Sequence, residues 1–288
     1  MAPTAKVEYD AKFTDAVIAS IGDGTDPRLK EIITSLIRHS HDFFRDINLN
    51  TDEFMTGLKY INWAGQMSNE RRNEGLLLTD ILGLESLSDE ITYKNAAANS
   101  DVTSSAILGP FWREDTPHRD FGTTISFDTP ADAEVAYMFG VVRDAKTGKP
   151  IPNATVDIWE ASTNGLYEQQ DQNQREHNLR GIFTTNAQGE YALYCIRPTP
   201  YPVPNDGPAG KLLELLQRHP YRPAHIHLMV KANGYLSITT QIFDKRTKYL
   251  EDDSVFAAKG DLLVDFVPRE GDPEAKLQCE YNIALAPQ

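Results

Sequence analysis

The sequence predicts a mainly β protein with an α-helical N-terminal part, divided into a helical domain over residues 1–105 and a β-sandwich over residues 106–288. Apolar residues recur at helical spacing over the first third of the chain. From about residue 122 the pattern changes to short alternating segments separated by turn residues, which is typical of a β-sandwich. A chain of 288 residues is long enough for one large domain or two modest ones.

Two helices are predicted near the N-terminus. Asp26 and Pro27 mark a helix start, because an Asp side chain caps free amides and Pro fits the first helical position. The residues that follow, 27–45, are apolar on one face. Asn50 and Glu53 resemble a capping box, so we expect a second helix from that point.

A further helical segment is expected from Ser68 to about Leu84. Leu77 and Ile81 fall on one face of it, and Asp80 lies among them. Taken alone, Asp80 is more easily explained as a solvated acid on the helix surface. Two glycines in the segment weaken the prediction that the helix is continuous.

The second part of the chain is expected to consist of short strands. Turn sequences at 147–150 (TGKP) and 186–189 (NAQG) separate neighbouring strands. The long segment 197–222 is too irregular to be a strand, and loops of that length in compact domains are often functional. The predicted strands cover residues 136–143, 154–159, 181–185, 191–196, 225–231 and 237–243.

Composition excludes several classes of protein. With 40% hydrophobic and 24% charged residues the chain has the composition of a soluble globular protein. Its net charge of −14 argues against binding to nucleic acid or to anionic membranes. Cys195 and Cys279 are too few for a disulfide framework, which fits a reducing compartment. No signal peptide or membrane-spanning run is evident, so we expect a cytoplasmic protein without membrane insertion.

His225 and His227 are the first indication of chemistry. Side chains two residues apart on a strand point the same way, so both imidazoles can reach one metal ion. They can equally be hydrogen-bonded strand residues. A zinc site would need a third ligand that the sequence does not reveal, and no acid within eight residues of His227 supports a cupin-like site. Tyr167 and Tyr201 stand out instead as possible oxygen donors.

Four motifs in order resemble the intradiol ring-cleavage dioxygenases. They are residues 107–111 (ILGPF), 164–167 (NGLY), 197–201 (RPTPY) and 222–227 (RPAHIH). The resemblance covers most of the chain and implies a β-sandwich catalytic domain preceded by a helical dimerisation domain. It also implies one Fe(III) per subunit, bound by Tyr167, Tyr201, His225 and His227. Phenolate oxygens suit a hard ferric ion.

The resemblance implies roles for three further side chains. The aromatic diol would displace Tyr201 from the iron, and the released tyrosinate would act as a base. Arg222 would stabilise negative charge on the ketonised substrate, which suits a permanently charged guanidinium. Gln241 would lie near the iron and hydrogen-bond a reaction intermediate, although a Gln on a strand is often only a cross-strand partner.

Residues 109–112 (GPFW) resemble the hydroxyquinol 1,2-dioxygenases more than the catechol enzymes. In the hydroxyquinol branch a Leu and an Asp three residues apart line the pocket, and Asp80 could accept a hydrogen bond from the third ring hydroxyl. The substrates would then be hydroxyquinol and O2, with catechol as the alternative diol. The residues expected to line the substrate pocket are Leu77, Asp80, Ile107, Leu108, Gly109, Pro110, Phe111, Val203, Pro204, Arg222 and Val255.

Two other classes of protein remain possible from the sequence. Residues 140–156 also resemble transthyretin-like and carbohydrate-associated β-sandwich binding modules, which would need no metal ligands. A zinc hydrolase built on the histidine pair is the second. The dioxygenase resemblance further implies a homodimer formed by the N-terminal helices, with a phospholipid at that interface.

Overall fold

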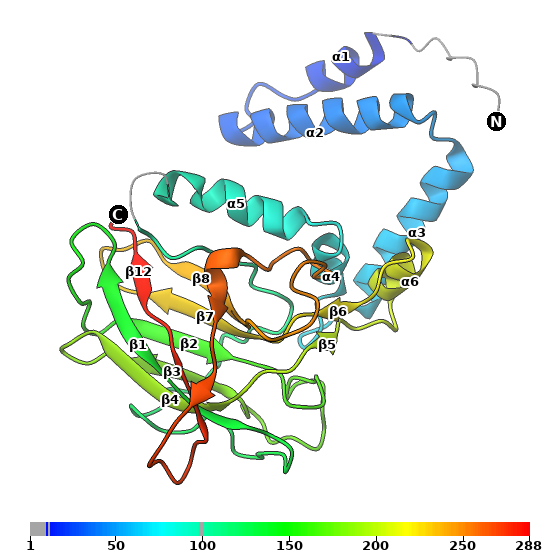
Figure 1. Cartoon of the computed structure of the whole chain (residues 1–288). Helices are drawn as coiled ribbons and strands as arrows, with labels where there is room; N and C mark the ends of the chain where they lie inside the picture. The colour runs from blue at the N-terminus through cyan, green and yellow to red at the C-terminus, as the bar shows by residue number, and fades with distance from the viewer. Residues whose placement is uncertain (1–9, 11, 98–100) are drawn as a thin grey trace. The chain divides into compact units, whose positions relative to one another are not determined.

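The structure is a computed structural model that describes residues 10, 12–97 and 101–288 (Figure 1). The chain forms two compact units that divide between Asn62 and Trp63. Helices α4 and α5 belong to the second unit because they pack against the sandwich, although the sequence groups them with the N-terminal helices. Within the described residues, no helix combines the length and apolar character needed to cross a bilayer.

The first unit contains α1 (Lys12–Ala19), α2 (Pro27–Asp46) and most of α3 (Thr51–Met67). The two predicted starts are confirmed. Asp26 Oδ1 accepts a hydrogen bond from Leu29 N at 2.9 Å. Asn50 and Glu53 form a reciprocal capping box, with Asn50 N to Glu53 Oε2 at 3.0 Å and Glu53 N to Asn50 Oδ1 at 3.1 Å. Helix α1 was not predicted.

The helix expected from Ser68 to Leu84 is instead two helices, α4 (Glu74–Asp80) and α5 (Leu84–Ala97). The cap of α4 is Asn73, whose side chain accepts from Leu76 N at 3.0 Å. Gly83, at φ +72°, adopts the left-handed conformation that ends one helix and redirects the chain into the next. The prediction of one helix from Ser68 to Leu84 therefore had the wrong start and the wrong end.

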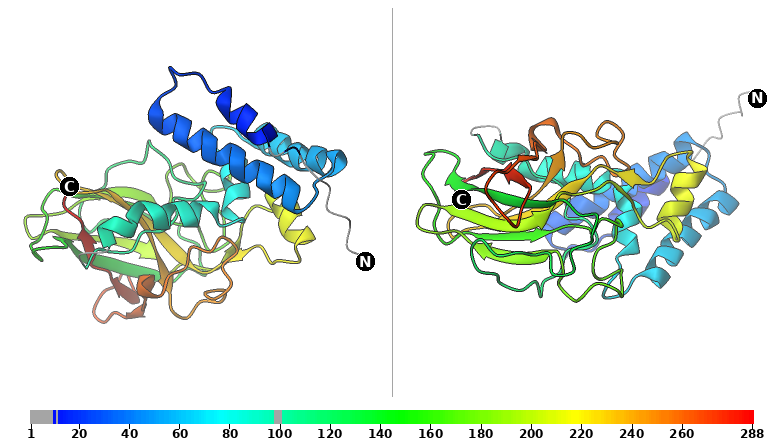
Figure 2. Two further views of the ribbon diagram at one scale, coloured as in Figure 1. Left: turned by 90° about the horizontal axis from the view of Figure 1, so that it is seen from above. Right: turned by 60° about the horizontal axis from the view of Figure 1, so that its bottom comes forward.

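Two five-stranded sheets form the sandwich of the second unit (Figures 1 and 2). The six predicted strands are confirmed to within two residues, and four short C-terminal strands were missed. The first sheet has the order β10-β11-β1-β12, with β4 also paired to β1. It contains β1 (Val135–Asp144), β4 (Glu190–Ile196), β10 (Val267–Pro268), β11 (Leu277–Glu280) and β12 (Ile283–Leu285). The second, in the order β3-β2-β7-β8-β9, contains β2 (Thr155–Trp159), β3 (Arg180–Thr184), β7 (His225–Lys231), β8 (Ile238–Asp244) and β9 (Leu263–Val264).

The main hydrophobic core lies between these sheets. Ile226, Leu228 and Val230 of β7 are fully buried in it beside residues of the first sheet. Because strand side chains alternate, His225 and His227 point to the opposite, outer face of the second sheet. A second apolar cluster, which joins α4 to α6 and to residues 255–262, lies beside Phe243 of β8.

Segment 197–222 contains more regular secondary structure than predicted. It contains β5 (Tyr201–Pro202), the helix α6 (Pro208–Leu215) and β6 (Tyr221–Arg222), and a short 3₁₀ helix, Gly260–Leu262, lies further along the chain. Strands β5 and β6 pair antiparallel, with Tyr201 opposite Arg222. The irregular-loop prediction missed this pairing, which brings a proposed ligand and the proposed charge stabiliser together.

Candidate metal centre

The two histidines of β7 are held rigidly on the outer face of the sheet. His225 and His227 are 1% and 2% exposed. Trp159, opposite His227 on β2, stacks on its ring at 4.8 Å between centroids. Gly109 lies against the same imidazole, since a Cβ added there would be 3.3 Å from His227 Cε1. Packing on both sides therefore limits rotation of this ring.

The two tyrosines reach the histidines from separate loops. Tyr167 is fully buried and stacks on Phe111 at 4.5 Å between ring centroids. Gly165, at φ +78°, lets the backbone before Tyr167 pass close to Tyr201, because a Cβ at this glycine would lie 2.6 Å from Tyr201 Cβ. The absence of a side chain at Gly165 therefore allows both phenols to occupy their positions.

The donor atoms of the four predicted ligands converge. Tyr167 Oη lies 3.0 Å from Tyr201 Oη, and Tyr201 Oη lies 3.2 Å from His225 Nε2. His225 Nε2 lies 3.2 Å from His227 Nε2. His225 Nδ1 is 2.7 Å from the carbonyl oxygen of Pro223, so Nδ1 carries the proton and donates it, and the Nε2 lone pair points into the cluster.

Burial determines the charge of this cluster. It raises the pKa of Tyr167 and Tyr201 above their usual value near 10. It also lowers the pKa of His225 and His227 well below 6.5. Near neutral pH the protein alone therefore holds two neutral phenols and two neutral imidazoles. A bound cation favours phenolate over phenol and binds neutral imidazole directly, so these residues fit a metal ion.

The donor set also favours one kind of ion. Two phenolate oxygens would offset two of the three charges of Fe(III), and imidazole nitrogen is a suitable ligand for iron. A thiolate ligand is excluded because Cys195 and Cys279, the only cysteines of the chain, lie buried in the sandwich core. The chemistry of the site therefore fits ferric iron.

Arg222 is fixed beside the cluster by three partners. Its Nε and Nη2 donate to the two carboxylate oxygens of Asp253, each at 3.2 Å. Nη2 also donates to Gln241 Oε1 at 2.7 Å, and Nη1 donates to His225 Nε2 at 2.9 Å. Gln241 Nε2 in turn donates to Ile107 O at 2.7 Å. Asp253 was not identified from the sequence, because no motif marks it.

The predicted pocket residues surround one small cavity next to the four donors. Of the predicted set only Leu108 is not part of its wall; that side chain packs in the cluster of Phe111 and Tyr167. The free volume is about 10 Å³, about one water molecule, so an aromatic ring fits only after lining side chains move. The wall consists of Leu77, Asp80, Ile107, Gly109, Pro110, Phe111, Tyr201, Val203, Pro204, Arg222, His227 and Val255.

Asp80 is the unusual residue of this wall. It is 1% exposed, and neither carboxylate oxygen meets an N–H or O–H donor in the described part of the chain. Burial, and after it the nearby carboxyl group of Glu85, raises the pKa of Asp80 to about 9. The interpretation of Asp80 as a solvated surface acid is therefore wrong.

Another group of possible metal ligands lies on the surface. Asp115, Glu176 and His177 place ligand atoms within 4.8 Å of one another. Arg113 already binds both carboxylates, at 2.8 Å for Asp115 and 3.0 Å for Glu176. A guanidinium thus supplies the positive charge there, and this group is best explained as a surface salt-bridge network.

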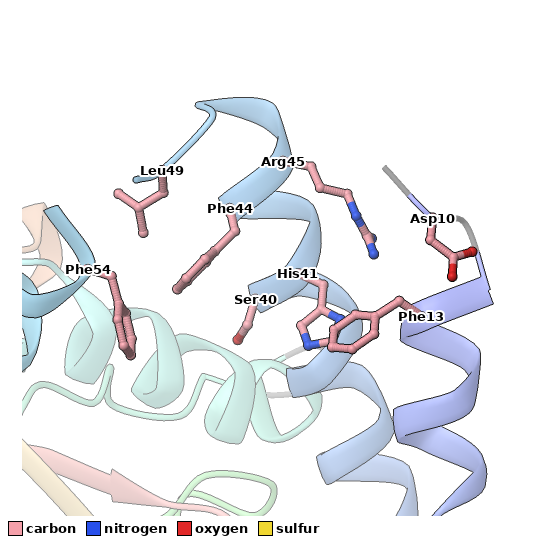
Figure 3. A pocket seen from close by; sticks show the side chains of 8 residues that line it. All are labelled: Asp10, Phe13, Ser40, His41, Phe44, Arg45, Leu49 and Phe54. Carbon is pink, nitrogen blue, oxygen red and sulfur yellow. The ribbon is translucent and has the colours of Figure 1, made fainter. Parts of the chain in front are cut away.

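The first unit has an apolar cavity of its own, of about 630 Å³ (Figure 3). Phe13 stacks on His41 at one side, and Phe44 and Phe54 approach each other to 5.6 Å between ring centroids. Phe13 is 58% exposed and Phe54 43%. Exposed aromatic surface of this size is typical of a site that binds another apolar molecule or chain. The lining residues are Asp10, Phe13, Ser40, His41, Phe44, Arg45, Leu49 and Phe54.

Models of two protein families match the chain. The family described as "Dioxygenase" matches residues 107–287, and the family described as "Catechol dioxygenase N terminus" matches residues 26–100. Together they cover both the helical part and the sandwich.

Individual relatives agree with these matches. An intradiol ring-cleavage dioxygenase of Aspergillus niger is 47% identical, over 96% of this chain and 89% of its own length. A catechol 1,2-dioxygenase of Candida albicans is 43% identical, over 95% of this chain and 91% of its own. The crystal structure of a hydroxyquinol 1,2-dioxygenase from Pseudomonas putida superimposes with a TM-score of 0.83 at 33% identity, covering 96% of this chain and 97% of that one.

Proposed function

The chain belongs to the intradiol ring-cleavage dioxygenases, and from that premise we propose that it is a ferric enzyme for hydroxyquinol, 1,2,4-trihydroxybenzene. The ring would open between the two adjacent hydroxyls with O2 and give 3-hydroxy-cis,cis-muconate, a tautomer of maleylacetate. The observation that carries the proposal is the convergence of two phenols and two imidazoles beside a cavity that has a buried acid in its wall.

Tyr167, Tyr201, His225 and His227 would hold the iron. Ferric iron, when bound, supplies Lewis acidity toward the diol oxygens and accepts electron density from the ring, which makes a ring carbon reactive toward O2. Tyr201 lines the cavity as well as the cluster. Its Oη would therefore be placed both to hold the metal and, as a base, to take up a proton from a diol hydroxyl.

Arg222 would place positive charge where the substrate becomes negative. Nη1 of Arg222 now donates to His225 Nε2; if that lone pair held a metal, Nη1 would be free to donate to a ring oxygen of the substrate. The bidentate contact with Asp253 keeps the guanidinium in place during this exchange. Gln241 would orient Arg222 through Nη2, in addition to any contact with a reaction intermediate.

The buried carboxyl group of Asp80 supports hydroxyquinol, rather than catechol, as the substrate. An acid buried among apolar walls has no solvent to bind, so a substrate hydroxyl that reaches it satisfies a polar group that catechol would leave unpaired. Catechol is the alternative substrate, favoured by the 43% identity to the Candida albicans enzyme named for it.

Kinetics with both diols test the substrate. We expect kcat/KM, followed by oxygen uptake, to be at least about tenfold higher for hydroxyquinol, and Asp80→Ala to narrow the gap. Equal turnover of the two diols by the native protein would count against hydroxyquinol and leave ring cleavage intact.

Colour tests the metal. A ferric tyrosinate centre should give the purified protein a red to purple charge-transfer band, and Tyr167→Phe should shift or abolish it. A colourless, iron-loaded sample would overturn the ligand assignment.

The helical part, residues 1–105, would serve as a dimerisation domain, and residues 106–288 would form the catalytic domain. The family matches to 26–100 and 107–287 support this division. The apolar cavity of the first unit (Figure 3) supports a homodimer with a phospholipid near that surface. Light scattering tests the dimer, and mass spectrometry of a solvent extract tests the lipid. Two free, buried cysteines support a cytoplasmic location.

A further inference from the structure

Arg180 of β3 is a fully buried arginine next to the four predicted ligands. It is 0% exposed, and its guanidinium carbon lies 5.8 Å from the centre of the Tyr167 ring. Across the sheet Arg180 is paired with Trp159, and Trp159 is paired with His227. Paired residues on neighbouring strands point to the same face of a sheet. Arg180 therefore shares the outer face that carries His227, and its charge has no part in the steps proposed above.

The guanidinium group of Arg180 is bound by the two residues that follow Tyr167. Its Nε donates to Glu168 Oε2 at 2.7 Å, and its Nη2 donates to Gln169 Oε1 at 2.6 Å. Glu168 Oε1 accepts a further hydrogen bond, from Arg113 Nη1 at 2.9 Å. Hydrogen bonds from a planar guanidinium fix the direction of their partners as well as the distance. Arg180 thus ties the loop that carries Tyr167 to the sheet that carries both histidines.

These contacts leave positive charge beside the Tyr167 ring. The carboxylate of Glu168 is shared by two guanidinium groups, those of Arg180 and Arg113. The other carboxylates that Arg113 binds are exposed, so solvent and salt screen their charge. An arginine side chain stays protonated in proteins, and a charge acts more strongly in a buried site than in water. Arg180 would therefore stabilise negative charge on a Tyr167 phenolate.

We propose that Arg180 is a positioning residue that fixes the Tyr167 ligand and, through its charge, weakens electron donation from that phenolate to the metal. This inference rests on the proposed function, because it takes Tyr167 as an iron ligand. Tyr201 is part of the cavity wall and Tyr167 is not, so an entering diol meets Tyr201 and leaves Tyr167 in place. A weaker phenolate donor leaves more positive charge on the metal, and that charge attracts the diol oxygens.

Three substitutions separate the position of Tyr167 from the charge beside it. Arg180→Met removes the charge and both hydrogen bonds, whereas Arg180→Lys keeps the charge but lacks the planar fork that holds both acceptors. Glu168→Gln keeps Arg180 and removes the carboxylate that offsets its charge. Arg269→Met is the matched control. Arg269 Nε also donates to a carboxylate at 2.7 Å, that of Asp272, and its guanidinium carbon lies 4.0 Å from the centre of the Tyr137 ring, which is not a predicted ligand.

The visible band of the iron-loaded protein measures the effect of the charge. The transition moves an electron from phenolate to metal, so a cation beside the ring raises its energy. We expect the band to move to longer wavelength in Arg180→Met, to move to shorter wavelength in Glu168→Gln, and to stay near the native position in Arg180→Lys and Arg269→Met. A merely structural role would not give shifts of opposite sign. Shifts of the same sign in Arg180→Met and Glu168→Gln, or no shift, would overturn the electrostatic role.

Hydrogen exchange of the metal-free protein measures the position of the loop without iron. Amides of residues 163–174 should exchange about tenfold faster in Arg180→Met, the effect of losing one charged hydrogen bond, and by a smaller factor in Arg180→Lys. Arg269→Met should leave their exchange unchanged.

Unchanged exchange of residues 163–174 in both Arg180 variants would overturn the positioning role. If Arg180→Met does not fold, exchange in Arg180→Lys and the band of Glu168→Gln decide the same two points. Absence of the band from native, iron-loaded protein would instead refute the ligand assignment in the proposed function.

Discussion

Binding of ferric iron is expected to release two protons from the four-donor cluster, and Tyr167→Phe should reduce this number to one. The count follows from the burial of the ligands. Because burial raises the pKa of both tyrosines above 10, the metal-free protein carries two phenolic protons near pH 7. Because burial lowers the pKa of His225 and His227 well below 6.5, it carries no imidazolium proton to lose.

The proton count fixes the pH dependence of iron affinity. The metal-free form binds two more protons than the loaded form, so affinity rises with pH and is lost as the pH falls. Between pH 6 and 8 the logarithm of the apparent binding constant should rise by about two per pH unit in native protein and by about one in Tyr167→Phe.

The assay is titration of metal-free protein with a ferric chelate by calorimetry, in buffers that differ in ionisation enthalpy. Protons released by the chelate or by bound water cancel when native protein and variant are compared. Tyr191→Phe is the matched control: Tyr191 is also a fully buried phenol with a raised pKa, but it donates to Tyr281 O at 2.7 Å within the sandwich core. It should leave the proton count unchanged.

Two outcomes would refute the reasoning. Equal proton release by native protein and Tyr167→Phe would show that Tyr167 does not bind the ion as phenolate. A native count that increases below pH 6.5 would show that an imidazolium proton is also displaced, and that burial does not keep His225 and His227 neutral.

Two further predictions concern the geometry around the cluster. Gly165→Ala should weaken the visible band and destabilise the fold more than Gly122→Ala; both glycines have positive φ, but only at Gly165 would the new Cβ collide, 2.6 Å from Tyr201 Cβ. Thermal unfolding and absorption spectra check this, and equal effects of the two substitutions would contradict it. Arg222→Lys should lower kcat about a hundredfold and keep the visible band, because one ammonium cannot maintain the bidentate contact with Asp253 and also stabilise substrate charge. An unchanged kcat in this variant would show that Arg222 does not stabilise substrate charge during the reaction.

Much of the site could be predicted from short stretches of sequence. The two-residue period of a strand places His225 and His227 on one face whatever lies around them. The helix starts at Asp26 and Asn50 followed from capping chemistry within three or four residues. At Gly83 two sequence signals disagreed, because the apolar spacing predicted a continuous helix and the glycine predicted a break. The expected single helix was wrong, since Gly83 adopts a positive φ that ends the helix.

The sequence by itself determined the fold class, the strand that carries the histidines and, through its motifs, the residues that converge on the cluster. Only the tertiary structure decided what surrounds them. Asp253 holds Arg222 from 31 residues away, and Glu85 binds the amide of Leu108 across 23 residues. Local periodicity sets which face of an element a side chain occupies, but such partners depend on how distant segments pack. Burial, and with it the charge of Asp80 and of the four ligands, is likewise a property of the packed chain alone.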